Sequence, residues 1–162
     1  MDPVTRTGVV VIASTRAAGG VYEDRCGPVL ADWLTDRGIT TPAPVVVADG
    51  EPVAAALEAA LADAPDVILT SGGTGISPTD ATPQITSALL DYEIPGLADA
   101  IRRSGLPKVP TSVLSRGVCG VAGRTLIVNL PGSLGGVRDG LGVLAEVLDH
   151  ALDQLHGKDH TR

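Results

Sequence analysis

A buried strand that breaks into glycines constrains the fold of this chain more than any other feature. Residues 66–71 form an apolar run of strand length, and residues 72–75 continue it as Gly-Gly-Thr-Gly. Glycine has no Cβ and tolerates positive φ angles, so backbone N–H groups can converge there and a phosphate can approach the main chain closely. Thr82 and Pro83 then form the expected N-cap and first turn of a helix. The pattern predicts a strand, an anion-binding loop and a helix N-terminus.

Asp80 lies between the glycines and this helix. A carboxylate repels phosphates unless a cation lies between them, and Mg²⁺ prefers hard oxygen ligands. We therefore interpret Asp80 as a Mg²⁺ ligand. The alternative is that residues 72–75 form only a sharp turn after a central strand, with Asp80 capping the helix from outside. Both interpretations are open for this segment taken alone.

Strand and helix patterns alternate along the chain. Apolar runs of strand length occupy residues 8–14, 45–48 and 66–71. Two later extended segments, 118–122 and 124–128, are joined through Gly123 as a hairpin or bulge. One apolar helical face at about 137–155 predicts a single long final helix. The alternation predicts a doubly wound sheet in one domain over residues 1–162, with loose tails at 1–7 and 157–162.

Polar residues follow several of these strands. Ser14 and Arg16 come after the first strand, Asp49 after the second and Asp80 after the central one. Open α/β sheets bind ligands at the carboxyl ends of their strands, so Asp49 and Asp80 are expected near enough to share a cation. Each residue also has an ordinary interpretation, Arg16 as a solvated surface arginine and Asp49 as the first residue of an Asp-Gly turn.

Composition excludes several classes of function. Only 2% of the residues are aromatic and the net charge is −7, which leaves few platforms for stacking bases and opposes binding to nucleic acid or an anionic membrane. No apolar run is long enough to span a bilayer, and the N-terminus does not resemble a signal peptide. Cys26 and Cys119 fit no metal-binding spacing, so we expect two plain thiols in a cytoplasmic protein.

Five segments in a fixed order carry a family resemblance. They are residues 20–24 (Gly-Val-Tyr-Glu-Asp), 70–83, 93–96 (Glu-Ile-Pro-Gly), 114–116 (Leu-Ser-Arg) and 129–133 (Asn-Leu-Pro-Gly-Ser). Together they resemble the molybdopterin adenylyltransferase family, the MogA/MoaB proteins of molybdenum cofactor biosynthesis, over nearly the whole chain. The resemblance implies a single-domain, three-layer α/β sandwich with a mixed, mostly parallel sheet. It also implies a homotrimer and transient contact with a molybdenum insertase.

The reaction implied by the resemblance is Mg²⁺-dependent transfer of AMP from ATP to the terminal phosphate of molybdopterin, with release of pyrophosphate. Asp49 and Asp80 match the two essential acids of the family, which we assign to Mg²⁺ binding and catalysis. Glu93 matches its acid before Pro-Gly, and a carboxylate there can accept hydrogen bonds from the pterin edge. The other implied substrate-binding residues are Ser14, Arg16, Ser71, Gly72, Gly73, Thr74, Gly75, Ser115, Pro131, Gly132 and Ser133.

Departures from the family pattern leave two functions open. Gly50 and Thr79 stand where many members have an acid and a base, and residues 134–136 (Leu-Gly-Gly) stand where many have a lysine. Fewer basic groups weaken phosphate binding. The chain is therefore either an adenylyltransferase or a non-catalytic carrier that holds molybdopterin for an insertase.

A third function, pterin dehydration, is disfavoured. A dehydratase needs histidines or another acid/base group that titrates near neutral pH. His150, His156 and His160 all lie on the last helix and the tail, where we expect solvated side chains.

Overall fold

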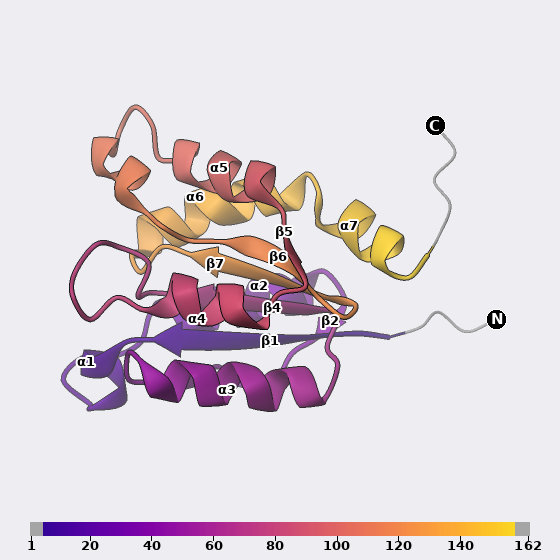
Figure 1. Cartoon of the computed structure of the whole chain (residues 1–162), viewed down its shortest axis with the longest axis horizontal. Helices are drawn as coiled ribbons and strands as arrows, with labels where there is room; N and C mark the ends of the chain where they lie inside the picture. The colour runs from indigo at the N-terminus through magenta and orange to yellow at the C-terminus, as the bar shows by residue number, and fades with distance from the viewer. Residues whose placement is uncertain (1–4, 158–162) are drawn as a thin grey trace.

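Within residues 5–157, which the computed structural model describes, a sheet of seven strands runs between two layers of helices (Figure 1). The strands are β1 (Arg6–Ala13), β2 (Ile39–Thr40), β3 (Val45–Val47), β4 (Val67–Ser71), β5 (Tyr92–Glu93), β6 (Cys119–Ala122) and β7 (Thr125–Leu130). The helices are α1 (Thr15–Ala18), α2 (Cys26–Asp36), α3 (Glu51–Ala62), α4 (Thr82–Leu89), α5 (Pro95–Arg103), the 3₁₀ helix η1 (Pro110–Leu114), α6 (Leu134–Ala145) and α7 (Leu148–Leu155).

The sheet is mixed and mostly parallel, as predicted. Its strand order is β2-β1-β4-β7-β6-β5, and β3 pairs with the carboxyl end of β1. All pairs among β1, β2, β3, β4 and β7 are parallel, whereas β6 runs antiparallel to both β7 and β5. The predicted hairpin is the β6–β7 pair. Because the parallel strands point the same way, β1, β3, β4 and β7 end at one edge of the sheet.

Alternating side chains of the central strands fill two separate cores. In β1, Val10 and Ile12 pack with α2, α5, α6 and α7 on one face, while Val11 and Ala13 pack with α3 and α4 on the other. Both faces are covered, which explains why the strand sequences are continuous apolar runs. The core is aliphatic throughout, and its largest fully buried side chains are leucines and isoleucines, among them Leu30, Leu69, Ile127 and Leu144.

The final helix is two helices, so the prediction of a single one is wrong. α6 ends at Ala145 and α7 begins at Leu148, because Val147 has non-helical backbone angles (φ −130°, ψ −16°). The break redirects the chain so that Leu148 and Leu152 of α7 reach the core as fully buried side chains. The spacing of apolar residues in the sequence does not reveal this break, because the same helical spacing continues from α6 into α7.

The ends of the chain are more ordered than predicted. Arg6 and Thr7 belong to β1 and pair with β2, and Arg6 also forms ion pairs with Asp149 and Asp153 of α7. At the other end, His156 is exposed, as predicted, and its ring contacts the carboxylate of Asp66 at 2.6 Å. The remaining parts of the predicted tails, residues 1–4 and 158–162 with His160, lie outside the described residues.

No helix in the described part of the chain is both long enough and apolar enough to cross a membrane.

Candidate active site

Two glycines let the end of β4 pass close to its neighbours. Gly72 has φ +95°, and a Cβ at this position would collide with the carbonyl oxygen of Ala13 at the end of β1. Gly73 has φ +67°, and a Cβ there would collide with the Thr82 hydroxyl. Any other L residue would therefore be strained by its backbone and blocked by its neighbours. The glycines keep the main chain accessible where the parallel strands end.

Asp49, just after β3, is fixed by Thr15. Its Oδ2 accepts hydrogen bonds from the Thr15 hydroxyl at 3.0 Å and the Thr15 backbone N–H at 3.3 Å. In return, the Asp49 backbone N–H donates to Thr15 Oγ1 at 3.1 Å. The other oxygen, Oδ1, faces the glycine loop, since a Cβ built on Gly73 would lie 3.1 Å from it. Thr15, which was not predicted as a site residue, orients this carboxylate.

Asp80 approaches the same loop from the other side. Its backbone N–H donates to Ser77 O at 2.9 Å and its Oδ2 accepts from the Ser77 N–H at 3.1 Å. A Cβ built on Gly75 would lie 2.8 Å from Oδ2. Asp49 and Asp80 thus come from segments that follow two different strands, β3 and β4, which both pair with β1, and they flank one glycine loop.

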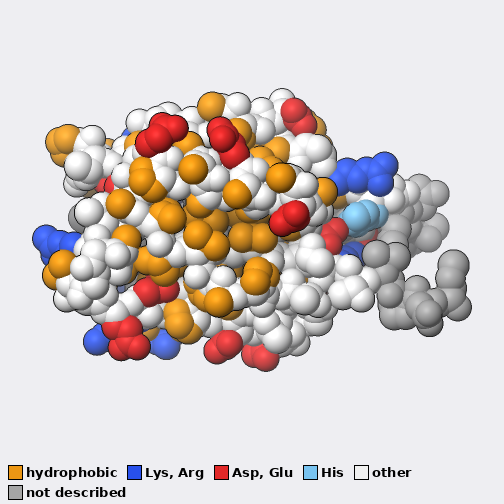
Figure 2. All heavy atoms as spheres, turned by 90° about the horizontal axis from the view of Figure 1, so that it is seen from below, with side chains coloured by type: hydrophobic (Ala, Val, Ile, Leu, Met, Phe, Trp, Pro, Cys, Tyr) orange, Lys and Arg blue, Asp and Glu red, His pale blue; other side chains and the backbone are white. Residues whose placement is uncertain are grey.

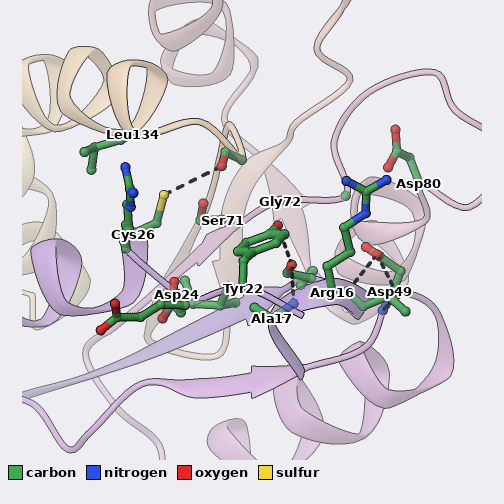
Figure 3. A pocket seen from close by; sticks show the side chains of 18 of the residues that line it. Arg16, Ala17, Tyr22, Asp24, Cys26, Asp49, Ser71, Gly72, Asp80 and Leu134 are labelled. Carbon is green, nitrogen blue, oxygen red and sulfur yellow. Dashed lines mark hydrogen bonds between the residues drawn. The ribbon is translucent and has the colours of Figure 1, made fainter. Parts of the chain in front are cut away.

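A cavity of about 900 Å³ opens at this edge of the sheet, and we call it the first cavity (Figure 3). Both aspartates line it together with the glycine loop, the first turn of α1 and the segment that leads into α2. In Figure 3 the Arg16 side chain extends toward the space between Asp49 and Asp80. Four carboxylates line the cavity, those of Glu23, Asp24, Asp49 and Asp80, and the two guanidinium groups are those of Arg16 and Arg25.

Ser14 and Tyr22 shape the wall of the first cavity. Ser14 is the N-cap of α1 and accepts a hydrogen bond from the Ala17 N–H at 3.2 Å. The hydroxyl groups of Ser14 and Tyr22 lie 2.9 Å apart, and Tyr22 itself is 52% exposed. An aromatic ring at the mouth of a polar cavity offers a face for stacking a base. Tyr22 was not predicted as a site residue, although it belongs to segment 20–24, which carries part of the family resemblance.

A second cavity of about 760 Å³ adjoins the first and shares Gly73, Asp80 and Gly132 with it. Its walls come from α5, the connection through η1, and the turn that leads into α6. Ser133 caps α6 by accepting a hydrogen bond from the Gly136 N–H at 3.1 Å. The remaining N–H groups of this first turn and the partial positive charge of a helix N-terminus favour an anion. Arg102 and Lys108 add two positive charges to the lining.

The structure brings together all but one of the predicted site residues. Those in the first cavity are Ser14, Arg16, Asp49, Ser71, Gly72, Gly73, Asp80 and Gly132. Those in the second are Gly73, Thr74, Gly75, Asp80, Ser115, Pro131, Gly132 and Ser133. Glu93 is the exception: it lies exposed in the edge strand β5 and lines neither cavity. The position of Glu93 before Pro-Gly in the sequence does not indicate that it lies apart from the cavities.

Thr82 does not cap α4, contrary to the prediction. Ala81 is the N-cap residue and Thr82 is the first residue within the helix. The Thr82 hydroxyl is fully buried without a hydrogen-bond partner, beside Gly73 and near Asp49 Oδ1. Thr82 itself lines neither cavity, so its hydroxyl belongs to the packing beneath the glycine loop.

Neither thiol is suited to act as a nucleophile. Burial raises the pKa of Cys26, whose Sγ lies 3.6 Å from Gly132 O in the wall of the first cavity. Burial also raises the pKa of Cys119 to about 12, against smaller opposing effects of the Asn129 backbone and Arg102. Both groups are therefore protonated near neutral pH, and the site supports direct transfer between substrates better than a covalent thiol intermediate.

Comparison with known proteins shows the family to which this chain belongs. The family model for a probable molybdopterin binding domain matches residues 9–150. The chain belongs to this family. It is 39% identical to a molybdopterin adenylyltransferase of Escherichia coli K12, over 85% of this chain and 75% of that protein.

Other members of the molybdopterin-binding family agree in sequence and fold. The chain is 38% identical to a molybdenum cofactor biosynthesis bifunctional protein of Synechococcus elongatus over 93% of its own length, but it spans only 48% of that relative. The solved structure of the molybdopterin biosynthesis Mog protein from Mycobacterium ulcerans superposes with a TM-score of 0.89 at 68% identity, covering 93% of this chain and 99% of that one. The family fold expected from the sequence is confirmed.

Proposed function

We propose that this protein transfers AMP from ATP to the terminal phosphate of molybdopterin, giving adenylyl-molybdopterin and pyrophosphate. The observation that carries the proposal is the meeting of Asp49, Asp80 and the glycine loop in one cavity that adjoins a second. Relatives named molybdopterin adenylyltransferase support the same reaction. Two adjoining cavities suit a reaction that joins two substrates, because each substrate can be held separately with its reacting phosphate at the junction.

The residues of the site fit a Mg²⁺ ion. The carboxylates outnumber the guanidinium groups in the first cavity, so a polyphosphate requires a cation there. Among the described residues no three His, Cys, Asp or Glu side chains form a metal cluster. Mg²⁺ does not need one, since it is commonly bound by one or two carboxylates together with substrate phosphates. Asp49 and Asp80 would hold the ion, which would supply charge neutralisation to the reacting phosphates.

We assign ATP to the first cavity and molybdopterin to the second. Arg16 extends into the first cavity, where its guanidinium can bind phosphate oxygens, and the Tyr22 ring is available to the base. In the second cavity the first turn of α6 and Ser115 offer donors to the terminal phosphate and the pterin. Glu93 has no part in this assignment because it lies apart from both cavities.

The chemistry is a displacement at the α-phosphorus of ATP. An oxygen of the molybdopterin phosphate forms the new bond to phosphorus, and the bond to the bridging oxygen of the leaving pyrophosphate breaks. The protein contributes alignment and charge stabilisation through the N–H groups of residues 73–75 and through Arg16, whereas the Gly72 N–H donates to Leu130 O at 3.2 Å. A covalent enzyme intermediate is not required.

Pyrophosphate release tests the proposal directly. Purified protein given ATP, Mg²⁺ and molybdopterin should release pyrophosphate, and omission of any one should abolish release. Asp80→Asn removes the charge but keeps the size of the side chain, so turnover should fall by about 100-fold or more while the melting temperature stays close to wild type. Asp63→Asn, at an acid outside both cavities, is the matched control and should retain full activity.

A non-catalytic carrier is the second candidate function. Leu134, Gly135 and Gly136 provide no basic side chain in the first turn of α6 to stabilise charge on reacting phosphates, which counts against turnover. Tight molybdopterin binding without pyrophosphate release under any condition would support the carrier and refute the transferase.

We further propose that the protein is a cytoplasmic homotrimer that passes its product to a molybdenum insertase. Exposed and half-buried apolar residues of α3 and α4, among them Ala55, Ala59, Ile85 and Leu89, form a face suited to contact with another copy. Figure 2, seen from the side of α3, shows apolar side chains gathered on this surface. Sedimentation velocity should give three times the chain mass of 16.4 kDa, and a monomer would refute the assembly.

A further inference from the structure

Arg116 lies outside both cavities, yet it binds the segment that carries Asp80. Its backbone N–H donates to Thr74 O at 2.7 Å. Its side chain donates from Nε to Gly75 O at 2.8 Å, from Nη2 to Asp80 O at 2.8 Å and from Nη1 to Gln84 Oε1 at 3.1 Å. One side chain therefore joins the glycine loop, Asp80 and the first turn of α4.

These contacts close a loop that burial does not hold in place. Residues 76–79 are exposed, with Ile76 at 67%, and Gly75 and Asp80 stand at the two ends of this segment. The internal contacts between Ser77 and Asp80 fix the aspartate only relative to its own turn. Arg116 links both ends of the loop to each other and, through its own backbone N–H, to Thr74 of the glycine loop. A backbone hydrogen bond from the Thr82 N–H to Gly73 O at 3.2 Å also joins the two sides of this segment, but it does not contact the loop or the Asp80 residue itself.

We propose that Arg116 is a positioning residue that holds the Asp80 loop in the geometry needed to bind the Mg²⁺–polyphosphate. The inference rests on the proposed function, since that function gives the Asp80 carboxylate its role. The guanidinium binds two carbonyl oxygens and an amide oxygen and leaves the Asp80 carboxylate free of it. Its contribution is thus geometric. The planar guanidinium of arginine has several N–H donors in a fixed arrangement and can bridge these three oxygen atoms. A lysine ammonium is instead a compact charge on a flexible side chain.

Hydrogen exchange of the protein without substrates tests the positioning role. In Arg116→Gln and Arg116→Lys, backbone amides of residues 75–80 should exchange about ten-fold faster than in wild type, because local opening becomes easier. Amides in β1 and β7 should be unchanged, which separates local loosening from general unfolding. Arg103→Gln is the control, since Arg103 is also an exposed arginine and its side chain pairs with Asp99 on its own helix. It should exchange as the wild type does.

Kinetics provide the second readout. In both Arg116 variants the Mg²⁺ concentration for half-maximal pyrophosphate release should rise about ten-fold and kcat should fall, while KM for molybdopterin changes less than two-fold. Wild-type exchange of residues 75–80 in both variants would overturn the proposal. Full recovery of the Mg²⁺ dependence by Arg116→Lys would overturn it too, because charge alone would then suffice. A wild-type protein that releases no pyrophosphate refutes the proposed transferase, but the exchange experiment still decides whether Arg116 holds the loop.

Discussion

At the scale of single residues, the site depends on residues that orient the two aspartates through hydrogen bonds. Thr15 accepts and donates hydrogen bonds to fix Asp49, and Arg116 ties the backbone of Asp80. Gly73 contributes by having no side chain, because it leaves room between the Thr82 hydroxyl and Asp49 Oδ1. The carboxylates are useful only in the orientation that these neighbours impose.

Gly73→Ala should abolish most turnover. The new methyl group would collide with Thr82 Oγ1 and press on Asp49 Oδ1 at 3.1 Å, in a backbone with φ +67° that alanine adopts poorly. We expect turnover to fall by about 100-fold, with a loss of about 1–3 kcal/mol in the free energy of unfolding.

Gly123→Ala is the matched control for this prediction. Gly123 has a similar φ of +62° in the β6–β7 turn, and a Cβ there would meet nothing within 4 Å. It should show the backbone cost of about 1 kcal/mol in chemical denaturation but keep its kcat. Equal losses of turnover in the two variants would contradict a specific steric role for Gly73.

At the scale of elements, the helices are placed by how closely they approach the strands. The α6 helix contains Gly140 over the side chain of Leu130 in β7, and this close approach sets the position of the N-terminal turn that lines the second cavity. The break between α6 and α7 also contributes to the packing of helices on the sheet, since it brings Leu148 and Leu152 into the core.

Alanine substitutions at two glycines of α6 distinguish the effect of packing on stability from the effect of helix propensity. A Cβ at Gly140 would lie 2.5 Å from Leu130 Cδ2 in a fully buried region, so Gly140→Ala should destabilise the fold by about 1–3 kcal/mol. Gly142→Ala, two residues on, meets nothing within 4 Å and should stabilise it by about 0.5–1 kcal/mol. Urea denaturation of the two variants measures both effects. Stabilisation by Gly140→Ala would show that α6 can move away from β7 at little cost.

At the scale of the whole molecule, stability depends on a buried apolar core on both faces of the sheet. Cys119 belongs to that core and is 1% exposed. Its burial raises its pKa from 9.0 to about 12, so the folded state retains a proton that the unfolded chain releases above pH 9. This contribution to stability is complete below pH 9 and is lost as the pH rises from 9 toward 12.

The free energy of unfolding should therefore fall by about 1 kcal/mol per pH unit between pH 9 and 12 on account of Cys119 alone. Cys119→Ala should be less stable at pH 8, because it leaves a small cavity, but its profile above pH 9 should be flatter by that slope. Denaturation at several pH values compares the two proteins, so that other groups titrating in this range cancel. Parallel profiles of wild type and Cys119→Ala would contradict the raised pKa.

The sequence by itself determined strands β1, β3, β4, β6 and β7, the glycine loop and the edge of the sheet where the site lies, but it did not predict the two-residue strands β2 and β5. Apolar runs, glycines and the acids at positions 49 and 80 are local signals, and the direction of parallel strands fixes which edge they share. Most of the candidate site was predictable for this reason. The family resemblance supplied Ser115 and Ser133, which the structure places in the second cavity.

Only the tertiary structure decided which residues support that site and which lie apart from it. Arg116 is 36 residues from Asp80 and Thr15 is 34 from Asp49, so no local spacing could pair them. Glu93 stands in a recognisable segment, yet sheet order carries it to the far edge strand. The break before Leu148 likewise follows from packing against β7 rather than from propensity. Local patterns specify elements, whereas contacts between distant segments follow from how those elements pack.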